Sequence, residues 1–286
     1  MKDVLRIAIQ KSGRLNEQSV QLLKECGVKV GNGSSTLIAR ASNFPLEALF
    51  LRDDDIPQYI EDNVADAGIL GENVVAEKRK KVEVLEQLGF ARCRLSLAIR
   101  REDEYGDVSF FNGKKIATSY PEILKSFLKK NKVKAEIEEI SGSVEIAPGI
   151  GLADGIFDIV STGSTLFTNG LKEVETIMHS QAVLIANRKL NKSKTEILEK
   201  LLFRIRAVNN ARSNKYILLN APDKSLDKIC KLLPGIKSPT ILPLAKTGWS
   251  SLHSVVKEDV FWEVIDELKK VGAEGILVVP IEKMVV

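Results

Sequence analysis

The sequence has few of the residues from which metal sites, disulfides and membrane spans are built. It contains three cysteines and two histidines among 286 residues. Cys26, Cys93 and Cys230 lie far apart with no C-x-x-C pair, and neither His179 nor His253 has an obvious nucleophile partner. We therefore expect no zinc site, no disulfide framework and no catalytic triad. No run approaches roughly 18 consecutive apolar residues and the first ten residues contain no signal-peptide core, so we expect a cytoplasmic protein that makes no membrane contact.

The sequence also lacks a strong charge imbalance and the common nucleotide-binding motif. Lys plus Arg number 42 and Asp plus Glu number 38, which leaves a net charge of +4. That excess is too small and too dispersed to favour nucleic acid, although it would suit small polyanions. No G-x-x-x-x-G-K-[ST] and no G-x-S-x-G occurs in the chain. We expect catalysis, if any, to act through positioning and electrostatics rather than through a covalent intermediate.

What is present is an alternation of short apolar runs with helical repeats, which is typical of a parallel α/β sheet. Strands are predicted at residues 5–10, 65–71, 94–100, 114–119, 157–162 and 182–187. A helix follows the first strand and ends at Gly27, and another carries Pro121 in its first turn. A third helix is predicted from Ser193, because Ser193 and Glu196 form a capping box.

The last part of the chain has a different organisation. From residue 215 onward, apolar runs and amphipathic repeats follow in the order strand, helix, strand, strand, helix, strand. This βαββαβ order is that of a ferredoxin-like domain. Such a unit after a catalytic body often binds an effector or a partner, so a separate regulatory domain is expected here.

The stretch DIVSTGST, residues 158–165, is the first candidate site. Asp158 lies near the end of a predicted strand, and Thr162, Gly163, Ser164 and Thr165 follow where a helix is expected to begin. Backbone N–H groups and hydroxyls at such a turn favour a phosphate, and glycine lets the backbone approach it closely. Asp158 could accept hydrogen bonds from two ribose hydroxyls. The alternative is an ordinary strand–turn–helix connection capped by Ser or Thr.

Cations at predicted strand ends form a second candidate site. Lys11 and Arg14 flank the turn after the first strand, where open α/β sheets place their ligands. Arg52 precedes three acids, residues 53–55, which could hold Mg²⁺ but are better explained as a self-capping loop. In GILGENV, residues 68–74, a strand ends at Gly71 and the polar pair Glu72 and Asn73 follows, as in a turn that a ligand approaches closely.

One long motif carries a family resemblance. The run EIAPGIGLADGIFDIVSTGSTL, residues 145–166, resembles the signature of ATP phosphoribosyltransferase at every specified position. LRIAIQKSGRL, RDDDIP, GILGENV, CRLSLA, KKIATSYP, SPTILPLA and GILVVPIEKM resemble further blocks of that family in the same order. The resemblance covers nearly the whole chain, and its last two blocks are those of the long form.

The resemblance implies an architecture. The fold would be α/β, with a two-lobed catalytic body like a periplasmic binding protein and a C-terminal ferredoxin-like, ACT-like regulatory domain. Residues 1–93 and 183–212 would form the first lobe, residues 94–182 the second lobe with the phosphate loop, and residues 213–286 the histidine-sensing domain. The family's long form is a homo-hexamer built from dimers.

The resemblance also implies an activity. The enzyme would transfer 5-phosphoribosyl from 5-phosphoribosyl diphosphate (PRPP) to N1 of ATP, releasing pyrophosphate, in the first step of histidine biosynthesis. Histidine would inhibit it, and Mg²⁺ would be carried mainly by PRPP and ATP, with no protein metal ligand assigned. The residues implied are Glu145 and Asp158 for catalysis; Ser161, Thr162, Gly163, Ser164 and Thr165 for PRPP; Lys11, Arg14, Arg52, Gly71, Glu72, Arg94 and Tyr120 for ATP; and Ile236, Ser238, Thr240 and Gly275 for histidine.

The sequence departs from the expected pattern in three places. Residues 31–51 are less typical of the family, which bears on the nucleotide pocket, and Asn220 occupies a variable position, which bears on histidine inhibition. Phe157 precedes Asp158 where other phosphoribosyltransferases carry two adjacent acids, so Glu145 is expected to supply the second carboxylate. Two other classes remain open: a non-catalytic binding protein of the same shape, and a regulatory partner of a separate catalytic subunit.

Overall fold

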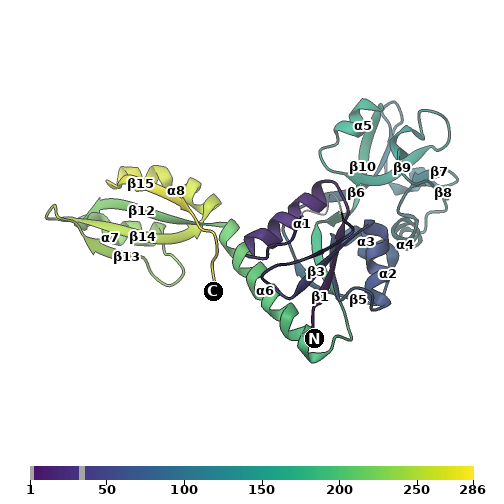
Figure 1. The fold of residues 1–286 in the computed structure, drawn as a ribbon. Coiled ribbons are helices and arrows are strands. Elements are labelled where there is room, and N and C mark those ends of the chain that lie inside the picture. Colours follow the sequence, from purple (N-terminus) through teal and green to yellow (C-terminus); the bar gives the residue numbers. More distant parts are fainter. Residues whose placement is uncertain (1–2, 32–35) are drawn as a thin grey trace. The chain divides into compact units, whose positions relative to one another are not determined.

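The computed structural model describes residues 3–31 and 36–286. The chain divides into two compact units, Met1–Leu198 and Glu199–Val286. Both units are mixed α/β structures, and Figure 1 labels their elements. No helix among the described residues is long and apolar enough to cross a membrane.

The first sheet of the N-terminal unit has six strands in the order β2-β3-β1-β4-β11-β5. Its strands are β1 (Leu5–Gln10), β2 (Ile38–Arg40), β3 (Leu46–Leu51), β4 (Ala67–Gly71), β5 (Val82–Gln87) and β11 (Ala182–Asn187). β1 runs parallel to β3 and β4, whereas β11 runs antiparallel to β4 and β5. Figure 1 shows α1 (Arg14–Glu25) on one side of this sheet and α2 (Ile56–Glu61) and α3 (Glu72–Lys78) on the other. Apolar side chains on both faces are therefore buried, which is why these strands read as nearly continuous apolar runs.

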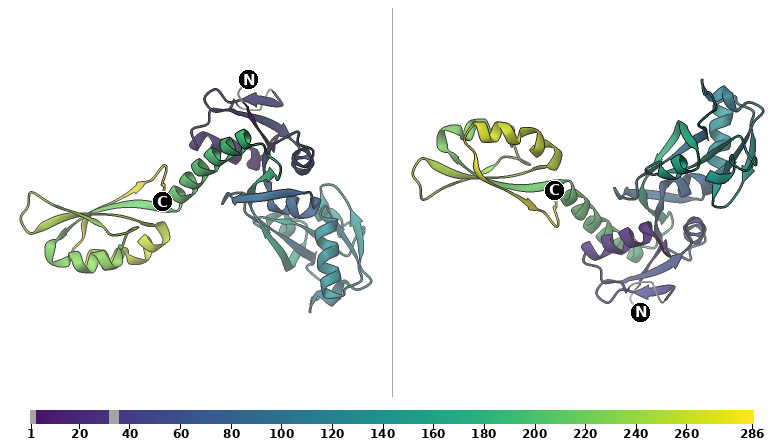
Figure 2. Two further views of the ribbon diagram at one scale, coloured as in Figure 1. Left: turned by 90° about the horizontal axis from the view of Figure 1, so that it is seen from below. Right: turned by 90° about the horizontal axis from the view of Figure 1, so that it is seen from above.

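The second sheet has five strands in the order β10-β6-β9-β7-β8. They are β6 (Cys93–Arg100), β7 (Lys115–Thr118), β8 (Glu136–Glu139), β9 (Gly155–Val160) and β10 (Leu171–Ser180). One face packs against α4 (Pro121–Asn131), and the other packs against the region of α5 (Ser164–Thr168). The chain passes between the two sheets after β5 and again after β10, and Figure 2 shows both sheets from two further directions.

Helix α3, beside the first sheet, contacts the start of α4, beside the second. The buried Glu77 carboxylate accepts the backbone N–H groups of Glu122 and Ile123 at 2.9 and 3.0 Å. These donors belong to the first turn of α4 and have no partner within the helix. The Arg79 guanidinium donates to the Glu122 carbonyl at 2.8 Å and to the Ser126 hydroxyl at 2.7 Å. A carboxylate from one helix therefore caps another helix.

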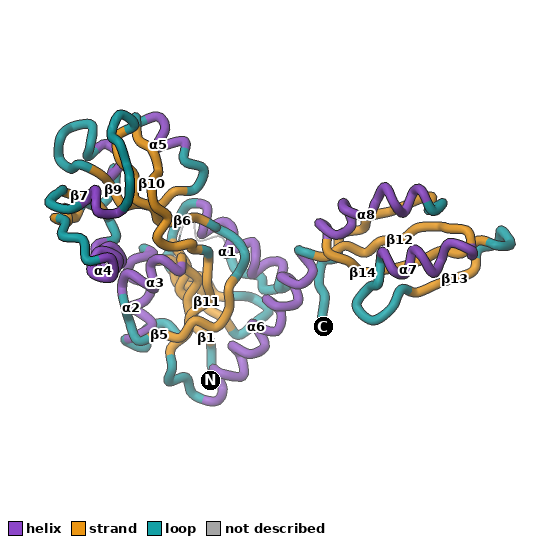
Figure 3. Tube along the Cα trace, turned by 180° about the vertical axis from the view of Figure 1, so that it is seen from behind, coloured by secondary structure: helices purple, strands orange, loops and turns teal. Residues whose placement is uncertain are grey.

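The C-terminal unit includes the end of α6 (Lys192–Arg212) and confirms the predicted βαββαβ order. Its remaining elements are β12 (Asn214–Pro222), α7 (Leu226–Leu232), β13 (Thr240–Pro243), β14 (Trp249–Lys257), α8 (Glu258–Lys270) and β15 (Glu274–Pro280). The antiparallel sheet has the order β13-β14-β12-β15, as in a ferredoxin-like fold. Figure 3 shows α7 and α8 against this sheet, and the core between them includes Ile217, Leu219, Ile229, Phe261 and Leu268.

The first residue of α6 and the residue that caps it both differ from the sequence-based expectation. The predicted capping box is wrong, because the helix begins at Lys192 and Ser193 lies inside it. The cap is Asn191, whose side-chain oxygen accepts the Lys194 N–H at 2.8 Å. Its backbone carbonyl also accepts the Thr195 N–H at 3.0 Å. An asparagine two residues earlier supplies the same chemistry as the expected serine.

Several strands were not predicted from the sequence: β2, β3, β5, β8 and β10. β2 and β3 lie in the less typical stretch at residues 31–51, of which residues 32–35 are outside the described residues. β8 and β10 carry acids along their length, in EIEE and LKEVETIMHS, which hides their strand character from a search for apolar runs.

Candidate active site

The loop after β9 has the backbone geometry of a tight anion-binding turn. Gly163 has φ +80°, a conformation that other residues rarely adopt. The first hydrogen bond of α5 runs from Phe167 N–H to the Gly163 carbonyl at 3.0 Å, so the preceding N–H groups have no helical partner. The Thr162 and Ser164 hydroxyls lie 3.0 Å apart. α5 has only five residues, so the individual amides and hydroxyls, rather than a long helix dipole, are the features that can hold an anion.

A cavity of about 320 Å³ opens beside this loop. It brings together eight of the residues predicted from the sequence, from four separate elements. They are Arg14, Glu145, Asp158, Ser161, Thr162, Gly163, Ser164 and Thr165. Ile159, Val160 and Leu166 complete its lining.

Two carboxylates face this cavity, and their surroundings differ from bulk water. The pKa of Asp158 is raised from 3.8 to about 6, mainly by burial, and the nearby charge of Glu145 contributes to this rise. A hydrogen bond from the Ile159 backbone partly offsets this rise. Arg14 is the cation in the same cavity. The site therefore combines two negative groups with main-chain donors, an arrangement suited to a ligand with both hydroxyl groups and a phosphate.

Tyr120 immediately precedes α4 and lies near acids from both parts of the unit. Burial raises its pKa, and the negative charges of Asp158, Asp53 and Asp54 raise it further. The phenol therefore stays protonated at neutral pH and can donate a hydrogen bond. Asp54 also pairs with Lys78 at 3.2 Å, which favours a self-contained loop over a metal site in residues 53–55.

Lys11 and Arg52 lie beside each other but do not line the cavity described above. The Lys11 N–H donates to the Leu51 carbonyl at 2.7 Å, which joins the carboxyl ends of β1 and β3. Both side chains are exposed. They form a cationic edge at the end of the parallel strands, where ligands of open α/β sheets bind.

Each of the three guanidinium nitrogens of Arg94 has a protein partner. Its Nε and Nη2 donate to the two oxygens of Glu173 at 2.6 and 2.5 Å, and its Nη1 donates to the Ser161 carbonyl at 3.2 Å. These bonds lower the pKa of Glu173 to about 2, so the pair stays ionised. The Ser96 hydroxyl adds a hydrogen bond to Glu173 at 2.7 Å.

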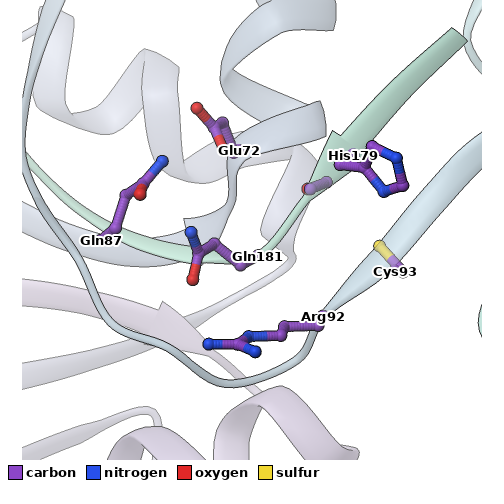
Figure 4. Close-up of a pocket in the computed structure, with 7 residues that line it drawn as sticks. Glu72, Gln87, Arg92, Cys93, His179 and Gln181 are labelled. Atoms are coloured by element: carbon purple, nitrogen blue, oxygen red, sulfur yellow. The ribbon is translucent and has the colours of Figure 1, made fainter. Parts of the chain in front are cut away.

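A second, smaller cavity of about 240 Å³ lies where the chain passes between the two sheets. It is lined by Glu72, Gln87, Arg92, Cys93, His179, Ser180 and Gln181. Figure 4 shows Glu72 on one side and Arg92 on the other, with Gln181 between them and Gln87 beside them. Gly71 ends the strand that leads into Glu72, and the Glu72 N–H donates to the Gln181 carbonyl at 2.9 Å. Of the predicted residues, only Glu72 lines this cavity.

Sequence reasoning missed the residues that reach these cavities from the crossing segments and from β10. Gln87, Arg92, His179 and Gln181 belong to no recognisable motif, and only the fold brings them together. Glu173 had no such signal either, because polar and apolar residues do not alternate regularly through KEVETIM and the strand pairing contains two register shifts.

The four histidine-site candidates do not meet within one chain. Thr240 begins β13, with Ile236 and Ser238 in the loop before it, whereas Gly275 lies on β15. β13 and β15 are the two edge strands, separated by β14 and β12. Three strand spacings of about 4.8 Å put these edges roughly 14 Å apart, which is farther than one amino acid can span.

Comparisons with known proteins agree with this geometry. A family model described as ATP phosphoribosyltransferase matches residues 52–207, and one described as the HisG C-terminal domain matches residues 211–283. The chain belongs to the ATP phosphoribosyltransferase family. A relative named ATP phosphoribosyltransferase from Cytophaga hutchinsonii is 59% identical over 100% of both chains. Another, from Bacteroides thetaiotaomicron, is 58% identical over 99% of this chain and 100% of its own.

Solved structures support the same family and fold. An ATP phosphoribosyl transferase (HisG:HisZ) complex from Thermotoga maritima matches with a TM-score of 0.64 and 28% identity, covering 73% of this chain and 100% of that one. The substrate binding protein of an amino acid ABC transporter matches with a TM-score of 0.50 and 12% identity, covering 73% of this chain and 94% of that one. The second likeness shows the fold alone and confirms that the body resembles a periplasmic binding protein.

Proposed function

We propose that this ATP phosphoribosyltransferase binds PRPP in the cavity of about 320 Å³ beside the 161–165 loop. The enzyme transfers 5-phosphoribosyl from PRPP to N1 of ATP and releases pyrophosphate, which is the first step of histidine biosynthesis. The observation that supports the location is the meeting of Glu145 and Asp158 with five loop residues around one cavity.

In this proposal the loop holds the 5′-phosphate through the amides and hydroxyls of residues 161–165. Asp158 and Glu145 accept hydrogen bonds from the ribose hydroxyls. As pyrophosphate leaves, positive charge develops at C1′ and the ring oxygen, and the two carboxylates stabilise that charge more than they stabilise the ground state. N1 of adenine then attacks C1′ from the opposite face. The enzyme acts through positioning and electrostatics, with no covalent intermediate.

We place ATP along the neighbouring edges of the site. Lys11, Arg14 and Arg52 provide positive charge for its phosphates, because they lie at the carboxyl ends of the parallel strands. Gly71, Glu72 and Tyr120 are the remaining candidates for the nucleotide pocket, whereas Arg94, which the resemblance also implies there, is bonded to Glu173 and to the Ser161 carbonyl. The cavity that contains Glu72 adds amide groups from Gln87 and Gln181 that can hydrogen-bond a purine edge.

We propose that Mg²⁺ enters as part of the substrates. No group of three or more His, Cys, Asp and Glu residues able to hold a metal occurs within residues 3–31 and 36–286. Diphosphate and triphosphate oxygens are themselves good Mg²⁺ ligands, so PRPP and ATP can carry the ion, which neutralises phosphate charge. Because both substrates are cytoplasmic metabolites, we place the enzyme in the cytoplasm.

We further propose that residues 213–286 bind histidine and that the enzyme works as a homo-hexamer of dimers. Residues 1–93 with 183–212 would form one catalytic lobe and residues 94–182 the other. Ile236, Ser238 and Thr240 lie at one sheet edge and Gly275 at the other. A pocket that uses both sets therefore needs two copies of the chain.

The catalytic proposal is tested by mixing the purified full chain with ATP, PRPP and Mg²⁺ and following pyrophosphate release and near-ultraviolet absorbance. Asp158→Asn should lose at least about tenfold in kcat, because a charge-assisted hydrogen bond is worth about 1.5–3 kcal/mol. The matched control is Asp62→Asn, an exposed acid that accepts a hydrogen bond from the Gln58 amide at 2.8 Å, which should keep full activity. Absence of turnover in the wild-type chain would instead support a non-catalytic binding protein.

The histidine proposal is tested by subunit mixing. Thr240→Val and Gly275→Ala should each weaken inhibition by histidine. Hexamers reassembled from equal amounts of the two variants should regain part of it, because some interfaces then combine an intact Thr240 with an intact Gly275. No recovery on mixing would place the pocket within one subunit.

A further inference from the structure

The backbone carbonyl of Ser161 is held by an arginine side chain from the neighbouring strand β6. It belongs to the peptide bond that opens the phosphate loop, and it accepts a hydrogen bond from Arg94 Nη1 at 3.2 Å. The Ser161–Thr162 peptide bond is trans. In a trans peptide the C=O and the N–H point in opposite directions. A bond that fixes the Ser161 carbonyl therefore also fixes the direction of the Thr162 N–H.

The direction of that peptide decides whether the loop attracts or repels an anion. With the carbonyl held by Arg94, the Thr162 N–H points away from the guanidinium. The described lining of the cavity includes Ser161 and Thr162 but not Arg94. The arginine therefore holds the loop from outside the cavity lining, and the Thr162 N–H points to the opposite side of the peptide. A flipped peptide would place a carbonyl dipole against the phosphate, which is unfavourable.

Arg94 is itself held in place by a rigid arrangement of neighbours. Glu173 on β10 accepts hydrogen bonds from the other two guanidinium nitrogens, Nε and Nη2, in the two-point geometry that fixes a planar group in orientation as well as position. Hydrogen bonds from the hydroxyls of Ser96 at 2.7 Å and Thr176 at 3.1 Å hold the Glu173 carboxylate. Ser96 is paired directly opposite Asp158 in the sheet.

We propose that Arg94 and Glu173 are positioning residues that orient the phosphate loop for PRPP, and that Arg94 does this by holding the Ser161–Thr162 peptide. The inference rests on the proposed location of PRPP and gives Arg94 a role behind the loop instead of in the nucleotide pocket. Lysine cannot replace it, because one ammonium group cannot form the two-point bond to Glu173 and reach the Ser161 carbonyl in a fixed plane.

The test uses steady-state kinetics on the full chain with Arg94→Lys and Glu173→Gln. Both should raise KM for PRPP about tenfold, as expected for a lost charge-assisted hydrogen bond, and leave KM for ATP unchanged. Ribose 5-phosphate, which carries the same phosphate, should lose affinity as a competitor of PRPP by a similar factor. The turnover number should change by less than the KM for PRPP.

Arg101→Lys is the matched control. Arg101 lies just after the same strand, and its guanidinium also bonds a backbone carbonyl, that of Phe167, at 2.8 Å. That carbonyl lies in α5 beyond the loop, so the control should leave KM for both substrates unchanged. Equal losses in all three variants would indicate a general structural effect and overturn the inference.

Two further outcomes separate the inference from the proposed function. A higher KM for ATP with unchanged KM for PRPP would return Arg94 to the nucleotide pocket and refute the positioning role. If Thr162→Val weakens ribose 5-phosphate binding while Arg94→Lys and Glu173→Gln do not, the phosphate site stands and only the inference fails. If ribose 5-phosphate does not compete with PRPP in the wild type, and Thr162→Val has no effect, the proposed site itself is wrong.

Discussion

Asp158→Asn should make the unliganded protein more stable while it lowers activity. Burial raises the pKa of Asp158 from 3.8 to about 6, so the ionised carboxylate opposes folding. Each pKa unit corresponds to about 1.4 kcal/mol, which sets a maximum of about 3 kcal/mol for this penalty at pH 8. Because the side chain is only partly buried and an amide keeps part of the desolvation cost, we expect a gain of about 1–2 kcal/mol in the free energy of unfolding.

The gain should depend on pH in a defined way. A carboxyl whose pKa is raised by folding stabilises the folded state below pH 3.8, and this contribution is lost as the pH rises through about 6. Asparagine does not titrate. The difference between variant and wild type should therefore be small near pH 4, grow between pH 4 and 6, and stay constant above about pH 7.

Urea denaturation followed by far-ultraviolet circular dichroism measures this difference. Both tryptophans, Trp249 and Trp262, belong to the C-terminal unit. Their fluorescence therefore follows the C-terminal unit, whereas circular dichroism follows the whole chain. Asp62→Asn, exposed and outside the cavity, should show no gain at any pH. A destabilised Asp158→Asn at pH 8, or a gain that does not change with pH, would refute the assignment of a buried, charged carboxylate.

Three further predictions concern neighbouring features. The kcat/KM for PRPP should fall about tenfold per pH unit below about pH 6, as Asp158 becomes protonated; a flat profile from pH 5 to 8 would contradict its role. Gly163→Ala should raise KM for PRPP several-fold, because alanine at φ +80° costs about 1–2 kcal/mol, whereas Gly170→Ala, with φ +69° outside the loop, should affect stability only. Glu77→Ala should lower the free energy of unfolding by about 1–3 kcal/mol, because two N–H groups of α4 lose their acceptor; an unchanged midpoint in urea would show that the cap contributes little.

Local patterns predicted those elements whose chemistry lies within one short segment. The helix after β1 was predicted to end at Gly27, and the structure confirms this, since α1 ends at Glu25 and Gly27 has φ +72°. The start of α4 at Pro121 is also confirmed. The capping box at Ser193 was wrong because several polar residues in a row could cap α6, and local sequence does not choose among them.

Strands that carry charge were missed because a strand is defined by its neighbours. β10 has acids at Glu173 and Glu175, yet it pairs along its length with the buried β6. Only its two end residues, Leu171 and Ser180, are buried, so its apolar content is low. No propensity within residues 171–180 predicts that partner.

The contiguous loop and the βαββαβ order were determined by the sequence alone. Residues 158–165 carry their acid, glycine and hydroxyls within one turn, and the C-terminal strands and helices follow one another in order along the chain. Residues that are close in sequence are therefore enough to predict the loop and the βαββαβ order. Only the tertiary structure decided which distant groups meet there. Glu145 and Arg14 reach the loop from other elements, and Arg94 meets Glu173 across 79 positions because β6 lies between β9 and β10. Such meetings depend on strand order and register, which long-range packing sets and local sequence does not.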